Sequence, residues 1–268
     1  MSKTRAKTTA KSPKAAASTA ASKGPFKRLD GDEAARRQVP HVHVYGNHVK
    51  CITDTRGYAT PDNQDRVRIV VDASEGYIPL WEPRRTLRWR FQAQSLALFE
   101  DPEAAKTEIR RLLGLALLAW GDAVPVKFAE RKDAWDFEVS LRNAADCDVN
   151  GCTLASAFFP DAGRHELVIY PTMLEQSEQE QVETLVHELG HVFGLRHFFA
   201  QTHEGQWASE VYGRHRPFSI MNYGSQSVLT KADRADLKKL YQAVWSGQLA
   251  EINGTPIRLV RPHHYPQD

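Results

Sequence analysis

Residues 187–197, which read HELGHVFGLRH, hold three histidines and a glutamate at fixed spacing. His187 and His191 are four residues apart, so on a helix they lie on one face, about one turn from each other. Two imidazoles in that relation bind one zinc ion, and Glu188 lies beside the first of them. This spacing predicts that Glu188 takes a proton from metal-bound water and does not itself bind the metal.

Gly194 is expected to end this helix, because glycine readily adopts the positive φ of a helix C-terminus. The chain then turns back and His197 reaches the same ion. Three histidines leave a fourth position for water, as in a catalytic zinc site, whereas a structural site is usually closed by four protein ligands. Zinc lowers the pKa of that water and polarises a carbonyl, and Glu188 serves as general base.

The flanking sequence supports a helix at this place. Ser177 and Glu180 form a capping-box pattern at its start, and Thr230 and Asp233 repeat the pattern before a last helix over 231–244. Asp101, followed by proline, predicts the start of another helix that ends near residue 120. Alternating or β-rich patterns predict strands at 86–92, 126–129, 136–141, 154–159 and 166–170.

Residues 219–223 read SIMNY and follow His197 by about two dozen positions. With these residues the stretch 81–246 resembles the catalytic domain of metzincins, most closely the matrixins, whose zinc motif is followed by such a methionine turn. The segments 116–130 (ALLAWGDAVPVKFAE) and 154–160 (LASAFFP) add to the resemblance. It implies an α+β fold: a metzincin-type twisted mixed sheet with an active-site helix and a small C-terminal subdomain.

The resemblance also implies residue roles. Met221 is expected to support the metal site from below, and Tyr223 to approach the metal and stabilise the transition state, with packing as its alternative role. Residues 154–160 are expected to form the edge strand that pairs with an extended polypeptide substrate. The expected activity is that of a zinc-dependent endopeptidase with one catalytic Zn²⁺. The alternative is a non-catalytic metzincin-like domain that binds a protein partner.

The sequence departs from matrixins where that family binds further metals. Ser156 and Val168 stand where matrixins carry ligands of a structural zinc, so we expect no second zinc. The calcium-loop pattern is reduced to Asp146, Asp148 and Asn150, whose oxygens still suit a hard cation.

The three cysteines leave two questions open. Cys147 and Cys152 are close enough in sequence to pair, which would make the turn around Asp148 a clipped, solvated loop and not a calcium site. Cys51 lacks the Pro-Arg-Cys-Gly context of the matrixin pro-segment. It either caps the zinc as a thiolate or is an ordinary buried cysteine, and we expect the latter. Phe198, where matrixins usually have serine, leaves the subfamily open.

Composition divides the chain into four parts. We expect a disordered basic tail over 1–24, an extension or pro-like segment over 25–80, the catalytic domain over 81–248 and a C-terminal tail over 249–268.

Charge is unevenly distributed along these parts. Residues 1–28 hold eight of the 35 Lys and Arg and no acid, so the remainder carries a net charge of −6. A solvated tail is expected in preference to a nucleic-acid partner. No apolar stretch predicts a signal peptide or a membrane span, and the sequence assigns no compartment.

Overall fold

The structure is a computed structural model. It describes residues 24–26, 43–45, 49–51, 53, 69–73, 75–148, 151–197, 209–212, 219–221 and 227–264. Residues 1–23 of the tail predicted over 1–24 lie outside the described residues, as do Asn150, Phe198 and Tyr223.

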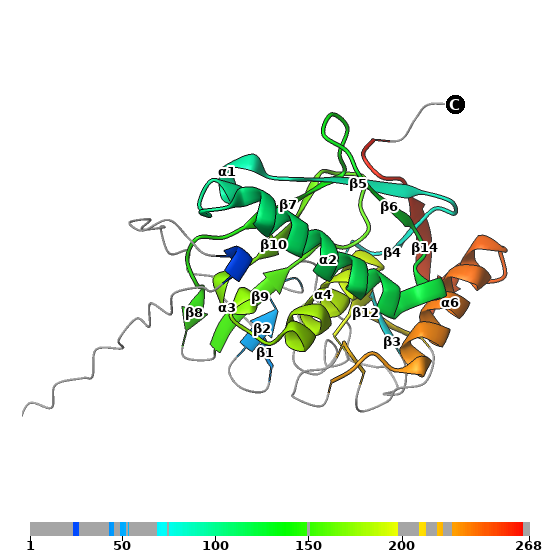
Figure 1. Cartoon of the computed structure of the whole chain (residues 1–268). Helices are drawn as coiled ribbons and strands as arrows, with labels where there is room; N and C mark the ends of the chain where they lie inside the picture. Colours follow the sequence, from blue (N-terminus) through cyan, green and yellow to red (C-terminus); the bar gives the residue numbers. More distant parts are fainter. Residues whose placement is uncertain are drawn as a thin grey trace, which may run out of the picture.

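A mixed eight-stranded sheet forms the centre of the molecule (Figure 1), in the order β1-β2-β9-β10-β7-β5-β6 with β8 beside β9. Strands β10, β7, β5 and β6 run parallel, and β9 is antiparallel to β10. The predicted twisted mixed sheet is therefore confirmed. Its strands are β1 (His43–Tyr45), β2 (Val49–Cys51), β5 (Thr86–Phe91), β6 (Lys127–Glu130), β7 (Phe137–Leu141), β8 (Cys147–Asp148), β9 (Gly151–Ser156) and β10 (His165–Ile169).

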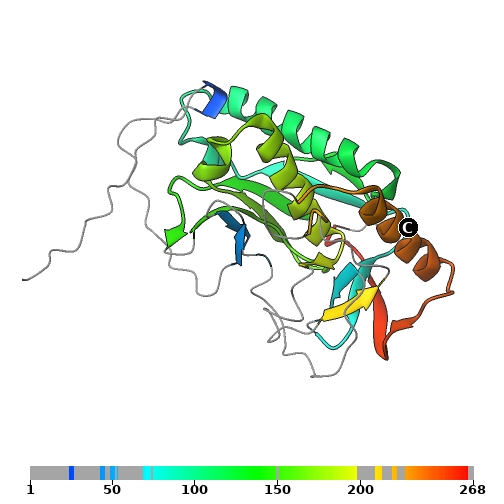
Figure 2. The same ribbon diagram turned by 90° about the horizontal axis from the view of Figure 1, so that it is seen from below.

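The helices α2 (Pro102–Trp120) and α4 (Glu178–Val192) lie together along one face of the sheet (Figure 2). Asp101 accepts a hydrogen bond from the Ala104 amide at 2.9 Å, which fixes the start of α2 as predicted. The capping box of Ser177 and Glu180 is formed at the start of α4. Leu112 and Leu185 are among the buried residues of these helices, so the core lies between them and the sheet.

Shorter elements complete the fold. Helix α6 (Lys231–Trp245) begins at its predicted capping box, formed by Thr230 and Asp233. Among the described residues, the short helical segments are η1 (Gly24–Phe26), α1 (Ala93–Leu96), η3 (Gly121–Ala123) and α3 (Pro171–Leu174). No helix in the described part of the chain is both long and apolar enough to span a membrane.

The strand β9 has a neighbour on each side, whereas the resemblance predicted that residues 154–160 form the edge strand of the sheet. On its outer side it pairs in parallel with β2, with Val49 opposite Cys152 and Cys51 opposite Ala155. An open edge presents unpaired N–H and C=O groups, and here a segment of the same chain pairs with residues 152–155 of that edge.

Two small sheets join the N-terminal segment to the rest of the fold. In the first, β3 (Ile69–Asp72) lies between β11 (Leu195–Arg196) and β12 (Ser209–Tyr212). In the second, β4 (Ile78–Trp81) pairs in parallel with β14 (Thr255–Val260), which also pairs with β13 (Glu251–Ile252). Further up the chain, Phe26 packs on Phe99 with ring centroids 6.3 Å apart.

The segment after residue 249 carries strands where the sequence predicted a tail. Asn253 and Gly254 both have positive φ, of 50° and 86°, and join β13 to β14 by a two-residue turn. Asn-Gly is the preferred pair for such a turn, because both positions need left-handed backbone. The hairpin signal was present in the sequence, but its parallel partner β4 lies far away along the chain.

Candidate metal centre

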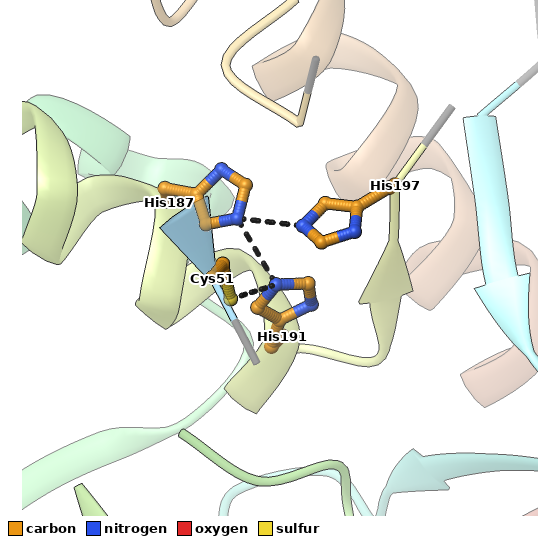
Figure 3. Close-up of side chains that lie close together, drawn as sticks. All are labelled: Cys51, His187, His191 and His197. Atoms are coloured by element: carbon orange, nitrogen blue, oxygen red, sulfur yellow. Dashed lines mark hydrogen bonds between the residues drawn. The ribbon is translucent and has the colours of Figure 1, made fainter. Parts of the chain in front are cut away.

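Helix α4 and the turn after it bring His187, His191 and His197 together, as their spacing predicts. The Nε2 atom of His187 lies 3.1 Å from that of His191 and 3.0 Å from that of His197. All three side chains are buried, and their rings converge on one point (Figure 3).

Backbone carbonyls fix the orientation of two of these rings. Nδ1 of His187 lies 2.7 Å from the Ile220 carbonyl oxygen, and Nδ1 of His191 lies 2.8 Å from that of Leu195. Since a carbonyl only accepts, each Nδ1 carries the proton and each Nε2 presents its lone pair to the shared centre. Lone pairs so close together repel one another unless a cation lies between them.

Cys51 joins this cluster from the end of β2. Its Sγ atom lies 3.5 Å from Nε2 of His191, and the four ligand atoms all lie within 4.8 Å of one another. A tetrahedral zinc site with ordinary Zn–N and Zn–S bonds has N–N separations of about 3.3 Å and N–S separations of about 3.5 Å. The donor set therefore fits one zinc ion with four protein ligands. From the sequence, Cys51 is expected to be an ordinary buried cysteine. The structure places its thiol among the three histidines instead.

Glu188 forms a hydrogen bond with Thr53 of the N-terminal segment. Its side chain is 1% exposed, and its Oε2 accepts a hydrogen bond from Thr53 Oγ1 at 3.0 Å. The same hydroxyl accepts from the Ala157 amide, just beyond β9, at 2.7 Å. Sequence reasoning missed Thr53, and no motif marks it, because its role comes only from the pairing of β2 with β9.

Side chains of β4 and α6 pack against the end of α4 and the turn that follows it. Gly194 has a φ of 89°, as predicted for the residue that ends the helix, and a Cβ there would lie 3.1 Å from Leu80 Cδ2. Trp81 Nε1 donates to the Val192 carbonyl at 2.7 Å, and Tyr241 Oη donates to the Phe193 carbonyl at 3.1 Å. Burial raises the pKa of Tyr241, so its hydroxyl remains a donor at neutral pH.

Met221 packs against Gly190 of α4, and its predicted role of supporting the metal site from below stays a prediction. Met221 is buried, and its sulfur packs so closely on Gly190 that a Cβ at that position would overlap it. The glycine inside a helical motif was the available signal for this contact, and sequence reasoning did not use it. The role of Tyr223 stays a prediction, since that residue lies outside the described part.

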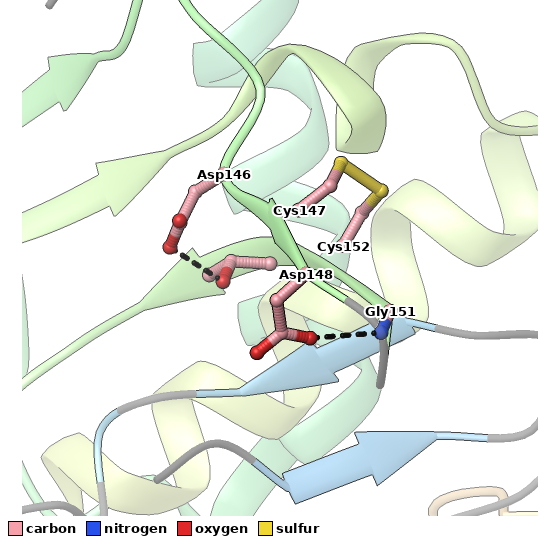
Figure 4. Close-up of a disulfide and its surroundings, with 6 residues drawn as sticks. Asp146, Cys147, Asp148, Gly151 and Cys152 are labelled. Atoms are coloured by element: carbon pink, nitrogen blue, oxygen red, sulfur yellow. Dashed lines mark hydrogen bonds between the residues drawn. A yellow bond between two sulfur atoms is a disulfide. The ribbon is translucent and has the colours of Figure 1, made fainter. Parts of the chain in front are cut away.

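The acidic loop before β9 is closed by a disulfide between Cys147 and Cys152, with a sulfur–sulfur distance of 2.05 Å (Figure 4). Asp146 Oδ2 accepts from Thr153 Oγ1 at 2.9 Å, and Asp148 Oδ1 accepts from the Gly151 amide at 3.2 Å. One oxygen of each carboxylate is thus engaged within the loop. Calcium binding here stays a prediction.

The positions linked to a structural zinc face each other in the sheet. Val168 of β10 is the register partner of Ser156 of β9. Neither side chain offers a nitrogen or a thiolate, the donors that structural zinc sites use most. The expected lack of a second zinc stays a prediction.

Comparison with known proteins connects this geometry to one family. The sequence model of the matrixin family matches residues 80–242. Metalloendoproteinase 4-MMP of Arabidopsis thaliana is 31% identical to this chain over 126 residues, which cover 41% of this chain and 35% of that protein. The chain therefore aligns with about a third of the length of this curated relative.

Among solved structures, the chain is similar to myroilysin. The similarity has a TM-score of 0.41 and a sequence identity of 13%, and it covers 64% of this chain and 98% of that one.

Proposed function

The chain belongs to the matrixin family, and we propose that it is a zinc-dependent endopeptidase with Glu188 as its general base. The observation that carries this proposal is the convergence of three imidazole Nε2 atoms beside a buried carboxylate. His187, His191 and His197 would hold the ion. When bound there, zinc would polarise the scissile carbonyl and make a water molecule more acidic.

Glu188 handles the proton in this proposal. Its carboxylate accepts a proton from the attacking water at Oε2 and donates it to the amine that leaves. The Ile220 and Leu195 carbonyls keep the imidazoles of His187 and His191 in the tautomer that a metal ligand needs.

The substrate is proposed to be an extended polypeptide that pairs with β9. Support comes from the pairing of β9 with β2, which shows that a strand fits along the outer side of β9. A peptide in the same position would form main-chain hydrogen bonds with β9 and present its scissile bond near the histidines.

We further infer that the described conformation is a closed form. Cys51 takes the position that a fourth ligand needs, Thr53 occupies the proton-accepting oxygen of Glu188, and β2 covers β9. A peptide could reach the histidines, Glu188 and the outer side of β9 only after β2 and Thr53 have moved away. Cleavage by the intact chain is therefore expected to be slow.

The test is cleavage of a peptide library by zinc-loaded protein, in the natural chain and in a Cys51→Ala, Thr53→Val background. Zinc content of one per chain and cleavage that stops on adding a chelator are the expected results. Glu188→Gln should lower the rate by at least about 100-fold while zinc stays bound.

Glu183→Gln is the matched control, because Glu183 lies on the same helix and accepts a hydrogen bond from Gln179 instead. It should leave the rate unchanged. Full activity of Glu188→Gln would show that Glu188 is not the general base. Zinc binding without cleavage in the opened background would favour a non-catalytic protein-binding domain.

A further inference from the structure

A buried ion pair lies under the turn that carries His197. The Arg196 side chain is 0% exposed, and its Nη1 lies 3.4 Å from Oδ1 of Asp72. A charged side chain is seldom fully buried unless it is paired, so this arginine needs a specific role or a specific partner. Asp72 comes from β3, more than a hundred positions earlier in the chain.

Asp72 contacts the same turn through its backbone. Its amide donates to the Gly194 carbonyl at 3.0 Å, and β3 pairs with β11 so that Leu195 lies opposite Val71. The backbone of β3 therefore holds the turn along its length, while the carboxylate of Asp72 binds the guanidinium at its end.

The turn is connected to two of the three histidines. The Leu195 carbonyl accepts from His191 Nδ1, and His197 follows Arg196 directly. The Arg196 guanidinium also lies 5.6 Å from the centre of the Phe159 ring, which packs edge-on against His191 with centroids 5.5 Å apart. Arg196 thus contacts one histidine through the chain and the other through an aromatic ring.

We propose that the Asp72–Arg196 pair positions His191 and His197 for metal binding, so that β3 is part of the metal centre. The inference rests on the proposed zinc site. Outer-shell groups that orient a ligand commonly change metal affinity by about 10–100-fold when they are lost. Arg196 acts through its neighbours, so the lower end of that range applies.

The geometry explains why the pair is ionic. A guanidinium carries several N–H donors around a delocalised charge, so it can bind the Asp72 carboxylate at 3.4 Å while its central carbon lies 5.6 Å from the centre of the Phe159 ring. A lysine keeps the charge but lacks the planar guanidinium with its several donors. Methionine keeps much of the stem and loses both contacts.

The experiment measures the zinc dissociation constant of the full-length protein by competition with a coloured chelator, and the absorption spectrum of the cobalt-substituted protein. Arg196→Met should weaken zinc binding by about tenfold and change the cobalt bands. Asp72→Asn should act in the same direction. Arg196→Lys should recover part of the affinity.

Arg90→Met is the matched control, because Arg90 also combines an ion pair, with Glu138 at 2.8 Å, and an aromatic ring, Trp135 at 4.4 Å. It should leave zinc affinity and the cobalt bands unchanged. Melting temperatures with and without zinc are compared as well. If the ion pair only stabilises the fold, its loss should lower both melting temperatures equally and leave the difference between them unchanged.

The outcomes separate this inference from the proposed function. If the natural chain binds no zinc, the proposed metal centre itself fails. If the natural chain binds zinc and Arg196→Met binds it as tightly or more tightly, the positioning role is overturned. Should Arg196→Met not fold, Asp72→Asn and Arg196→Lys decide the question in the same assay.

Discussion

Strands β2 and β3 both come from the segment before residue 81, yet the contacts around them reach different parts of the metal centre. Cys51 at the end of β2 and Thr53 just after it contact the groups that would carry out chemistry, since Cys51 lies beside His191 Nε2 and Thr53 binds Glu188. Residues 69–72 contact the supporting backbone instead, at Gly194 and along β11.

The difference indicates two functions for a segment that the sequence presents as one extension. Contacts with reactive atoms compete with substrate, so their loss should expose the site. Contacts with the supporting turn order the site, so their loss should disassemble it. Changes in the two strands are therefore expected to act in opposite directions.

The largest effect on stability is expected from a charge placed at a buried position of β3. Val71 is 0% exposed, and Val71→Asp would place an unpaired carboxylate among apolar side chains. We expect the free energy of unfolding to fall by about 4 kcal/mol, with loss of bound zinc. Chemical unfolding and metal analysis measure both quantities.

Leu118→Asp is the control for this change, because Leu118 is 74% exposed on α2. It should alter stability by no more than about 0.5 kcal/mol. If the Val71→Asp protein keeps its zinc and its stability, β3 does not support the metal centre, and the proposed difference between the two strands is wrong.

A smaller and opposite effect is expected at Cys51. Cys51→Ala removes the thiol beside His191 while the three histidines remain. We expect the intact chain to cleave peptide at least about tenfold faster, since that gain corresponds to about 1.4 kcal/mol of released ground-state stabilisation. Initial rates are measured while mass spectrometry verifies that residues 1–53 remain attached. An unchanged rate would mean that the thiol does not limit access.

The smallest effect is expected at Thr53. Thr53→Val keeps the shape of the side chain and removes the hydroxyl that binds Glu188 Oε2 and the Ala157 amide. A hydrogen bond to a charged group contributes about 1.5–3 kcal/mol, part of which is lost again in the unpaired amide. In the Cys51→Ala background we expect a further increase in rate of about three- to tenfold.

The four combinations at these two positions form a double-mutant cycle, which measures whether the two contacts act independently. Equal rates of Cys51→Ala with and without Thr53→Val would show that the hydroxyl does not hold the base.

Several parts of the site could be predicted from the sequence because they are encoded within a few residues. The i, i+4 histidines share a helix face, the Ser177–Glu180 box starts that helix, and Gly194 ends it. Each of these features depends on hydrogen bonds or backbone angles that neighbouring residues satisfy among themselves. The convergence of His197 with the other two histidines follows from the same local turn.

The remaining contacts were decided by tertiary structure. Thr53 lies 135 positions from Glu188, Cys51 lies 140 from His191, and Asp72 lies 124 from Arg196. All three depend on which strand pairs with which, and the backbone groups that form those pairs are the same in every residue. The sequence by itself therefore determined the histidines, their helix and the family. Only the packing of β2 and β3 against β9 and β11 determined that one N-terminal strand covers the metal centre while the other supports it.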